Sequence, residues 1–348
     1  MPELLFVSAL ACAVMTAGLV RMLRPPRRSA AVVRALAAAA VAAAVVVPLG
    51  AVTGAETTSY LLASAFAAGP VSVLLGGAAQ EVAPGRGGVA WALVLTWAGI
   101  VFPVASVVPP LVLAGCDASE CRAEDFGGAL ALLVTSAAAV LPAWRAPSSG
   151  VREGWARFAL PALVVWLAAV VWLASLEGVI DAYTPRILLA AVVAPAGGAA
   201  GWLLVDVLKG TPRHPVRSAA DGALAGLVAI VPGVAGISFP WSLVVGVLAG
   251  AAAAVVYGSR RLSSGGRAGH WALVVLASTA IGYLAPAITG DTIGFVFTGR
   301  IAALLPPVAA FASAAALGLV LSVPSWLLAR DARRAPDATA PRNEKTPG

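Results

Sequence analysis

This chain has few charged residues. Asp, Glu, Lys and Arg make up 11% of its 348 residues, whereas soluble domains carry about 25%. Apolar residues make up 60%, and the mean hydropathy is +0.92. These values exclude a soluble globular domain and predict a protein of the lipid bilayer.

The chain also lacks the side-chain constellations that carry enzymatic chemistry. It has two histidines and three cysteines, and no nucleophile with a base, phosphate-binding loop or metal cluster lies in or near an apolar stretch. The Gly-rich residues 263–266 fall in a predicted loop, without the strand, turn and helix that a phosphate site needs. We therefore predict a protein that is not an enzyme and holds no cofactor and no metal.

Apolar stretches of about 20 residues, the length of a helix that crosses a bilayer, recur along the whole chain. They lack the period-two alternation of transmembrane barrel strands. The first stretch begins at Met1 without a charged segment before it, so we expect a retained helix and not a cleaved signal. We predict an all-α polytopic membrane protein with eleven transmembrane helices, at residues 4–22, 31–52, 57–79, 88–114, 126–144, 156–176, 185–208, 218–238, 240–257, 270–289 and 301–328.

Basic residues are divided unequally between the two sets of alternate loops. Of the 23 Lys and Arg, only Arg122, Arg186 and Arg300 fall in one set, and all the others fall in the opposite set or the tail. The positive-inside rule then predicts a multi-pass protein of the plasma (inner) membrane, with the N-terminus outside and the C-terminus in the cytoplasm. The net charge of +7 follows from this topology, so we expect no nucleic-acid binding.

The end of the chain and its cysteines give further expectations. Residues 330–348 are polar and contain proline, which predicts a disordered cytoplasmic tail after a membrane domain of residues 1–329. Cys116 and Cys121 lie in a predicted outer loop, on the side where disulfides persist, whereas Cys12 lies within the first span. A bridge between Cys116 and Cys121 and a pair of free thiols both fit their spacing.

Two carboxylates lie at predicted ends of transmembrane helices. Asp125 precedes the fifth span, and Asp221 opens the eighth. A carboxylate at a helix N-terminus accepts hydrogen bonds from free backbone N–H groups and meets the positive end of the helix dipole. We expect a helix cap at both positions, although ionisable groups at membrane depth are also candidate functional residues.

Several stretches resemble the ammonium transporter (Amt/Rh) family. DGALAGLVAIVPGVAGI at 221–237 is similar to the family pattern GAxAGLVxIxPxxG, and the stretch that begins DFGG at Asp125 is similar to DFAGGxxVH. FAAGPVSVLLGGAAQ at 66–80 resembles FAxITxxLIxGAxAE, and IGYLAPAITG at 281–290 resembles GGxxGxxLTG. With residues 188–212, which resemble the seventh helix and its loop, the similarity extends over nearly the whole chain.

The resemblance implies a homotrimer with a narrow apolar pore through each subunit. The pore would lie between two five-helix halves related by an inverted repeat, with a final helix after them. Ammonium would be collected in an outer vestibule, lose its water behind paired phenylalanines and pass two facing histidines. By motif position, Phe66 is one gate phenylalanine, Asp125 is the aspartate that shapes the vestibule, and Trp172 is the tryptophan of the sixth helix.

The histidine positions of the pore depart from the family pattern. Counted from the neighbouring motifs, they fall on Leu133 and Ser278. The two histidines of the chain, His214 and His270, fall in a loop and at a helix start, so they are not the pore pair. The chain therefore lacks the imidazole relay that the family resemblance implies.

The outer part of the pore departs as well. The second gate phenylalanine falls on Ser175, the vestibule serine on Val179 and the vestibule tryptophan on Pro109. Two hypotheses of different classes follow. The chain is a channel or transporter with a degenerate pore that passes ammonium, ammonia or another small neutral solute. Alternatively, it is a non-conducting sensor or partner subunit, in mixed trimers with another transporter.

Overall fold

The computed structural model describes residues 2–25, 27–53, 55–113, 125–142, 155–210, 214–259, 267–290 and 294–334. Regular secondary structure in these ranges is helical throughout. Ten helices are long and apolar enough to cross a membrane, and a shorter apolar helix, Leu130–Val140, stands at the place of the fifth predicted span. The ten and this shorter helix correspond to the eleven spans predicted from the sequence.

The elements follow one another in this order: α1 (Pro2–Leu23), α2 (Arg28–Thr53), α3 (Ala55–Phe66), α4 (Ala68–Val82), α5 (Gly87–Thr96), η1 (Trp97–Val101), α6 (Phe102–Leu113), η2 (Leu130–Val134), α7 (Thr135–Val140), α8 (Trp155–Ser175), α9 (Thr184–Lys209), α10 (Pro215–Ile230), η4 (Val231–Gly233), α11 (Phe239–Gly258), α12 (Arg267–Thr289), α13 (Phe295–Thr298), η5 (Ile301–Leu304) and α14 (Leu305–Arg334). Elements α3 and α4 form one span, and α5, η1 and α6 form another. Elements η1 and η2 are turns of π-helix.

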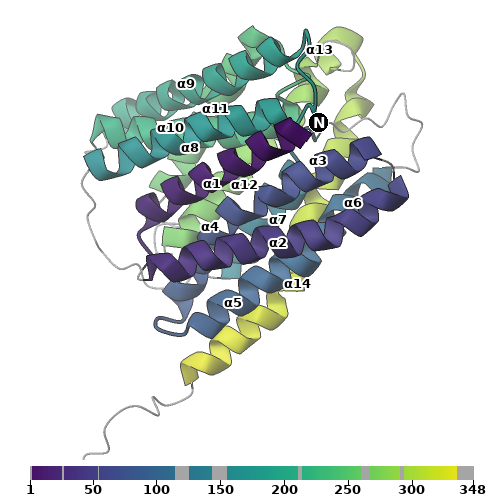
Figure 1. Ribbon diagram of the computed structural model, residues 1–348. Helices are drawn as coiled ribbons and strands as arrows, with labels where there is room; N and C mark the ends of the chain where they lie inside the picture. Colours follow the sequence, from purple (N-terminus) through teal and green to yellow (C-terminus); the bar gives the residue numbers. More distant parts are fainter. Residues whose placement is uncertain are drawn as a thin grey trace, which may run out of the picture.

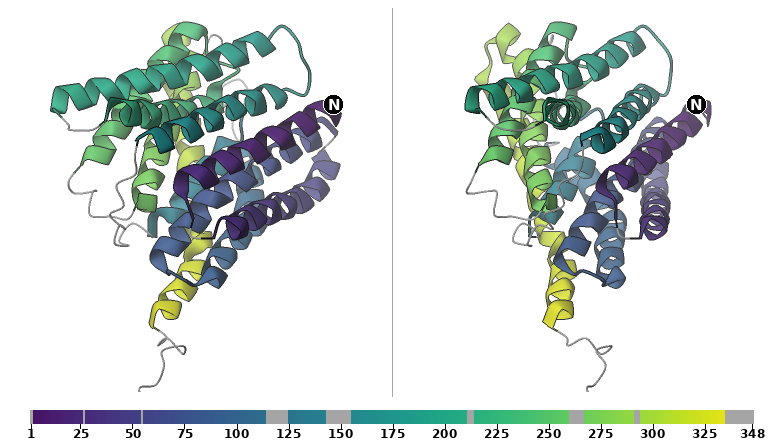
Figure 2. Two further views of the ribbon diagram at one scale, coloured as in Figure 1. Left: turned by 60° about the vertical axis from the view of Figure 1, so that its left-hand side comes forward. Right: turned by 90° about the vertical axis from the view of Figure 1, so that its left-hand side faces the viewer.

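The helices form two packed groups (Figures 1 and 2). One group contains α9, α10 and α11, and the other contains α2 to α5. Helix α1 packs along α8, and the last helix, α14, crosses α5, α6 and α7. The indole N–H of Trp326 in α14 donates a hydrogen bond of 2.6 Å to the carbonyl oxygen of Ala139 in α7. The last span is thereby attached to the fifth.

Glycine allows the closest helix crossings. A Cβ atom on Gly282 of α12 would overlap the carbonyl oxygen of Ala229 in α10, and one on Gly198 of α9 would overlap that of Gly222 in α10. Since lipid supplies no hydrophobic drive for helix association, such contacts between small residues hold transmembrane helices together. The abundance of glycine and alanine in the sequence thus serves backbone packing.

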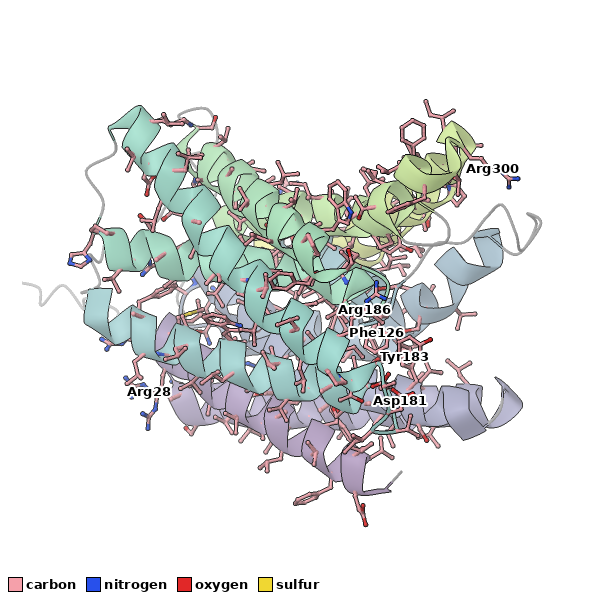
Figure 3. The ribbon with its side chains drawn as sticks, turned by 90° about the horizontal axis from the view of Figure 1, so that it is seen from above. Arg28, Phe126, Asp181, Tyr183, Arg186 and Arg300 are labelled. Carbon is pink, nitrogen blue, oxygen red and sulfur yellow. The ribbon has the colours of Figure 1, made fainter. Side chains whose placement is uncertain are left out.

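The two ends of the bundle carry different residues. Figure 3 shows Arg28 at one end and Phe126, Asp181, Tyr183 and Arg300 towards the other. This separation is the one expected if the ends of successive spans alternate between the two sides of a membrane.

Two predicted boundaries differ from the structure. Helix α14 continues to Arg334, past the predicted limit of the membrane domain at residue 329, and residues 335–348 lie outside the described part. Asp221 is not a helix cap, because α10 begins earlier, at Pro215. Its buried carboxylate instead forms an ion pair of 3.1 Å with Arg217, one turn before it in the same helix.

Candidate functional site

The turn before the fifth span is built around Asp125. Its Oδ1 accepts a hydrogen bond of 2.5 Å from the backbone N–H of Ala129, and its Oδ2 accepts one of 3.1 Å from that of Leu130. The carboxylate therefore caps the helix start, as the sequence analysis expected of this residue. Burial raises the pKa of Asp125 from 3.8 to about 6, although the two backbone hydrogen bonds lower it in part.

Local backbone conformation and close packing explain the two glycines of the DFGG motif. Gly128 has φ +62°, a conformation that favours glycine. A Cβ on Gly127 would overlap the side chain of Val231 in η4. The backbone N–H of Phe126 donates a hydrogen bond of 2.8 Å to the carbonyl oxygen of Pro232. The motif thus fixes the turn of Asp125 against the end of α10.

A cavity of about 150 Å³ lies beside this turn. Asp125, Gly128, Leu130 and Ala131 line one side of it, and residues of α3, α6 and α12 line the rest. Its hydroxyl groups come from Tyr60, Ser64, Ser106 and Tyr283. This volume is enough for a few water molecules or one small solute.

The hydroxyl groups of the cavity differ in their partners. The hydroxyl of Tyr60 donates a hydrogen bond of 2.8 Å to the carbonyl oxygen of Asp125, and that of Ser106 donates one of 2.9 Å to Phe102 in its own helix. The buried Oγ of Ser64 has no hydrogen-bond partner within the described part of the chain. A small polar molecule in the cavity would meet the hydroxyl groups of Ser64 and Tyr283.

Two π-helical turns lie beside the cavity. Element η1 ends immediately before Phe102, and η2 contributes Leu130 and Ala131 to the lining. The indole N–H of Trp97 in η1 donates a hydrogen bond of 3.0 Å to the hydroxyl of Thr135, which directly follows η2. Because a π-helical turn holds one more residue than an α-turn, it changes the direction of the side chains after it.

The residues predicted for the pore lie on four different elements. Phe66 ends α3, Trp172 and Ser175 lie at the end of α8, Leu133 lies in η2 and Ser278 lies in α12. Trp172 connects two of these elements, since its indole N–H donates a hydrogen bond of 3.2 Å to the carbonyl oxygen of Ala63 in α3. The Ser175 hydroxyl donates to the carbonyl oxygen of Trp172 at 2.7 Å.

The two positions predicted for the pore histidines carry little polarity. Elements η2 and α12, which hold Leu133 and Ser278, pack against each other. Leu133 is partly buried and packs on the main apolar cluster. Ser278 is fully buried, and its Oγ has no hydrogen-bond partner among the described residues. These two side chains provide one hydroxyl group and no titratable group.

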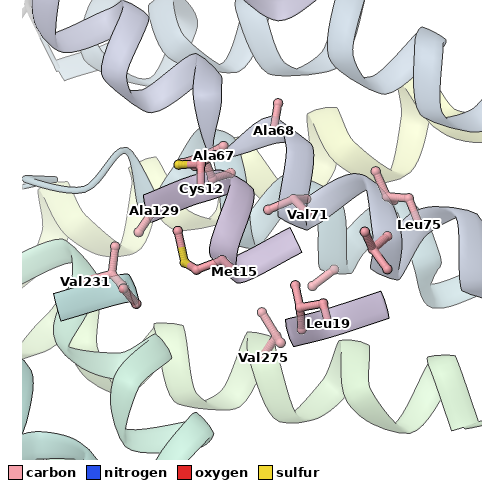
Figure 4. Packing of buried hydrophobic residues seen from close by; sticks show 14 of the residues in the cluster. Cys12, Met15, Leu19, Ala67, Ala68, Val71, Leu75, Ala129, Val231 and Val275 are labelled. Carbon is pink, nitrogen blue, oxygen red and sulfur yellow. The ribbon is translucent and has the colours of Figure 1, made fainter. Parts of the chain in front are cut away.

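Apolar side chains fill the interior between the two groups of helices. Met15 and Leu19 of α1 belong to one cluster with Val71 of α4 and Val275 of α12, and Figure 4 shows Leu19 and Val275 pointing toward each other. Val275 precedes Ser278 by one turn of α12. Leu133 packs on this same cluster, and Val275 lies one helical turn from Ser278, so apolar side chains adjoin both predicted histidine positions.

Acidic groups lie at the end of the bundle that carries Asp125. In the turn after α8, the hydroxyl of Thr184 donates a hydrogen bond of 2.7 Å to Glu177, and the backbone N–H of Tyr183 donates one of 2.7 Å to Asp181. Burial raises the pKa of Glu177, and the nearby Asp181 raises it further. In Figure 3, Asp181 and Tyr183 lie towards the same end of the bundle as Phe126.

The other predicted features are placed as follows. His214 is the residue before α10, and His270 lies in α12 with its ring 5.5 Å from that of Tyr257. Cys116 and Cys121 fall outside the described residues, so their pairing stays a prediction. In the part of the chain that is described, no three His, Cys, Asp or Glu side chains gather as a metal site would need.

Sequence reasoning missed the tyrosines of the cavity. Tyr60 and Tyr283 are two of four tyrosines in the chain, and both lie within apolar spans. Polar groups at membrane depth are a signal for function, and this signal was applied to the carboxylates alone. Nothing in the sequence indicated that two helices so far apart in the chain bring their hydroxyl groups to one cavity.

Comparison with known proteins gives both a sequence match and a structural match. The model of the Ammonium Transporter Family matches residues 168–329. The crystal structure of Candida albicans Mep2 has a TM-score of 0.74 at 19% identity, covering 94% of this chain and 83% of that chain. Saccharomyces cerevisiae Mep2 has a TM-score of 0.73 at 15% identity, with coverages of 94% and 84%. No curated protein sequence matches the chain significantly.

A further structural match is titled Sensor Amt Protein. It has a TM-score of 0.75 at 15% identity, and the match covers 97% of this chain and 96% of that chain. At such identities the structural matches establish the fold. The family match over residues 168–329 agrees with the resemblance to ammonium transporters that the sequence motifs indicated.

Proposed function

We propose that this chain, which matches the ammonium transporter family over residues 168–329 and shares the fold of its members, passes a small neutral solute across the membrane without net charge. Ammonia is the first candidate solute. The observation that carries the proposal is that Leu133 and Ser278, the positions that the motif register assigns to the facing histidines, carry no titratable group and lie on elements that pack against each other. A leucine and a serine offer no imidazole to accept or relay a proton.

The apolar interior supports a neutral solute over an ion. Met15, Leu19 and Val71 belong to one buried cluster with Val275, which lies one turn of α12 before Ser278. An ion that leaves water for such surroundings loses its hydration with little compensation, at a cost of several kcal/mol or more. Ammonia and other small uncharged molecules carry a much smaller cost. The predicted path thus discriminates by charge even without histidine.

The turn of Asp125 supports a role at the outer entrance. Its carboxylate is occupied by two backbone N–H groups, so its first role is to hold the turn. The cavity beside it, lined by hydroxyl groups such as those of Ser64 and Tyr283, can hold a small polar solute before it enters the path. We propose that Phe66 and Trp172 lie between this entrance and the constriction at Leu133 and Ser278.

Assembly and orientation complete the proposal. Apolar side chains are exposed on α1 and α8, such as Phe6 and Leu160, and on α9 and α11, such as Val207 and Leu248. These surfaces suit lipid or the neighbouring subunits of a homotrimer. With the outer end of the bundle at Asp125, the N-terminus lies outside the plasma membrane and the C-terminal tail lies in the cytoplasm.

The second candidate is a non-conducting sensor or partner subunit, alone or in mixed trimers with another transporter. One observation favours it: the matched structure titled Sensor Amt Protein is covered over 96% of its length. The loss of the pore histidines fits this candidate as well. The cavity at Asp125 would then be a ligand-sensing site with no path behind it.

Ammonia flux separates the two candidates. The purified protein is reconstituted in liposomes that contain a pH-sensitive dye, and an outward ammonium gradient is imposed in a stopped-flow instrument. A channel accelerates the pH change over protein-free liposomes, and Leu133→Trp, which fills the proposed constriction, abolishes the acceleration. If wild-type protein gives the rate of empty liposomes, the transport proposal is wrong and the sensor subunit remains.

A further inference from the structure

A buried arginine lies in the second span, at the end of the bundle opposite to Asp125. Arg34 is six residues from the start of α2, or about 9 Å along the helix. Its exposed fraction is 3%, and its neighbours Ala31 and Ala35 are buried as well. Val33 and Leu36, which face away from the bundle, are exposed by 54% and 65%. The arginine is therefore directed into the protein and not toward the side of α2 on which Val33 and Leu36 are exposed.

The guanidinium group packs against α4 at a glycine, where no side chain intervenes. A Cβ on Gly76 would lie 3.2 Å from Nε of Arg34, 3.4 Å from Nη2 and 3.7 Å from Cζ. Gln80 lies one helical turn further along α4, on the same face as Gly76. Its Oε1 is also buried without a hydrogen-bond partner in the described residues. Two buried polar groups without partners among the described residues thus lie on the facing sides of α2 and α4, one helical turn apart along α4.

The positive charge of Arg34 lacks a counter-charge. Its Nε is buried without a hydrogen-bond partner, and no carboxylate pairs with the group in the described part of the chain. An arginine does not lose its proton in a protein, so its charge stays. A buried charge without a partner is strongly unfavourable. In the pattern FAxITxxLIxGAxAE, which residues 66–80 resemble, an acidic residue stands at the position of Gln80.

We propose that Arg34 and Gln80 form a binding site for an oxyanion, with the Arg34 guanidinium as its receptor. The planar fork of a guanidinium binds phosphate or carboxylate through two parallel hydrogen bonds, and Nε is one of the donors that such binding uses. The amide of Gln80 adds a donor when its NH₂ group faces the anion. Gly76 leaves the space that the guanidinium occupies.

The shared chemistry is an oxyanion of phosphate type, from either of two sources. One source is the phosphate of a lipid headgroup, since a depth of about 9 Å from the helix start is close to the headgroup region. The other source is free phosphate from the aqueous side. This site is independent of the predicted solute path, so a failure of the anion proposal would not affect the proposed function, and the reverse also holds.

The test uses the full-length protein in a maltoside detergent, with sodium chloride as the only salt. In one arm, inorganic phosphate replaces chloride at constant ionic strength; in the other, phosphatidylglycerol is added to the micelles. The unfolding midpoint is measured in each. We expect wild type to be stabilised in one arm, which identifies the source. For Arg34→Gln, the anion concentration needed for the same rise in the unfolding midpoint should be about tenfold higher or more.

Two glycines of α4 supply the control. Gly76→Ala should weaken the anion effect, since its methyl group enters the space beside the guanidinium, whereas Gly77→Ala should leave it unchanged because nothing lies within 4 Å of a Cβ there. If Arg34→Gln fails to fold, the comparison of Gly76→Ala with Gly77→Ala still tests whether the anion binds at Arg34. No stabilisation of wild type in either arm overturns the proposal, and so does an equal anion effect in Gly76→Ala and Gly77→Ala.

Discussion

The indole nitrogen of Trp97 and the hydroxyl of Thr135 are joined by a hydrogen bond of 3.0 Å, and this bond connects the π-helical turns of the fourth and fifth spans. Both residues are fully buried. Thr135 also donates to the carbonyl oxygen of Ala131 at 2.5 Å, so its hydroxyl acts both as acceptor and as donor. The bond fixes the two irregular turns beside the cavity.

Replacement of Thr135 tests the importance of that bond. Thr135→Val leaves the Trp97 N–H buried without a partner, which should destabilise the protein by about 1–3 kcal/mol. Thr279→Val is the matched control, since Thr279 is equally buried and its hydroxyl donates a hydrogen bond to the carbonyl oxygen of Val275 in its own helix. Chemical unfolding in detergent should give a clearly larger loss of unfolding free energy for Thr135→Val than for Thr279→Val. Equal losses would mean that the Trp97 bond adds nothing.

The carboxyl of Asp125 should make stability depend on pH. Its pKa of about 6 in the folded protein lies above the ordinary value of 3.8. The folded state therefore holds the proton more tightly than the unfolded chain. This contribution is complete below a pH of about 4 and is lost as pH rises through about 6. Asp125→Asn should remove this part of the dependence of the unfolding free energy on pH, measured between acid and neutral pH. An unchanged dependence on pH would contradict the assignment.

The crossing of α10 and α12 should depend on Gly282. Because a Cβ there would overlap the carbonyl oxygen of Ala229, Gly282→Ala should push the helices apart and cost about 1–3 kcal/mol or more. Gly77→Ala, where a Cβ meets nothing within 4 Å, is the control. The midpoint of thermal unfolding should drop for the first variant alone. A normal midpoint for Gly282→Ala would show that the helices approach less closely.

Histidines at the two predicted positions should restore a route for protons. In Leu133→His with Ser278→His, the imidazoles provide the relay that the wild-type chain lacks. We expect a small ammonium-dependent current in proteoliposomes, below that of a complete transporter because the motif register assigns Ser175, and no phenylalanine, to the second gate position. Each single variant should remain silent. A current in the single variants equal to that of the double variant would place the two residues on separate routes.

The spans were predictable from the sequence because each needs about 20 apolar residues whatever its partners. The cap at Asp125 was predictable for a similar reason, since it uses backbone groups within five residues of itself. Asp221 was misread as a cap because α10 starts at Pro215, ahead of its first apolar run. Local rules thus worked where local contacts decide.

The cavity and the buried arginine could not be predicted in the same way. Tyr60 and Tyr283 meet at one cavity only through the packing of α3 and α12 around the fifth span. The π-helical turns beside it depend on packing against neighbouring helices and have no known sequence signature here. Arg34 entered the count of orientation charges, and its burial against Gly76 became visible only with both helices in place.

The central claim, that the path of this protein carries no charge, is tested most directly by current recorded from wild-type protein in proteoliposomes on a solid-supported membrane. After a rapid step in ammonium concentration, the account predicts no current above that of protein-free liposomes, because Leu133 and Ser278 offer no proton relay and the interior around Val275 is apolar. A robust, saturable current from the unmodified protein that is insensitive to substitution of Leu133 and Ser278 would contradict it.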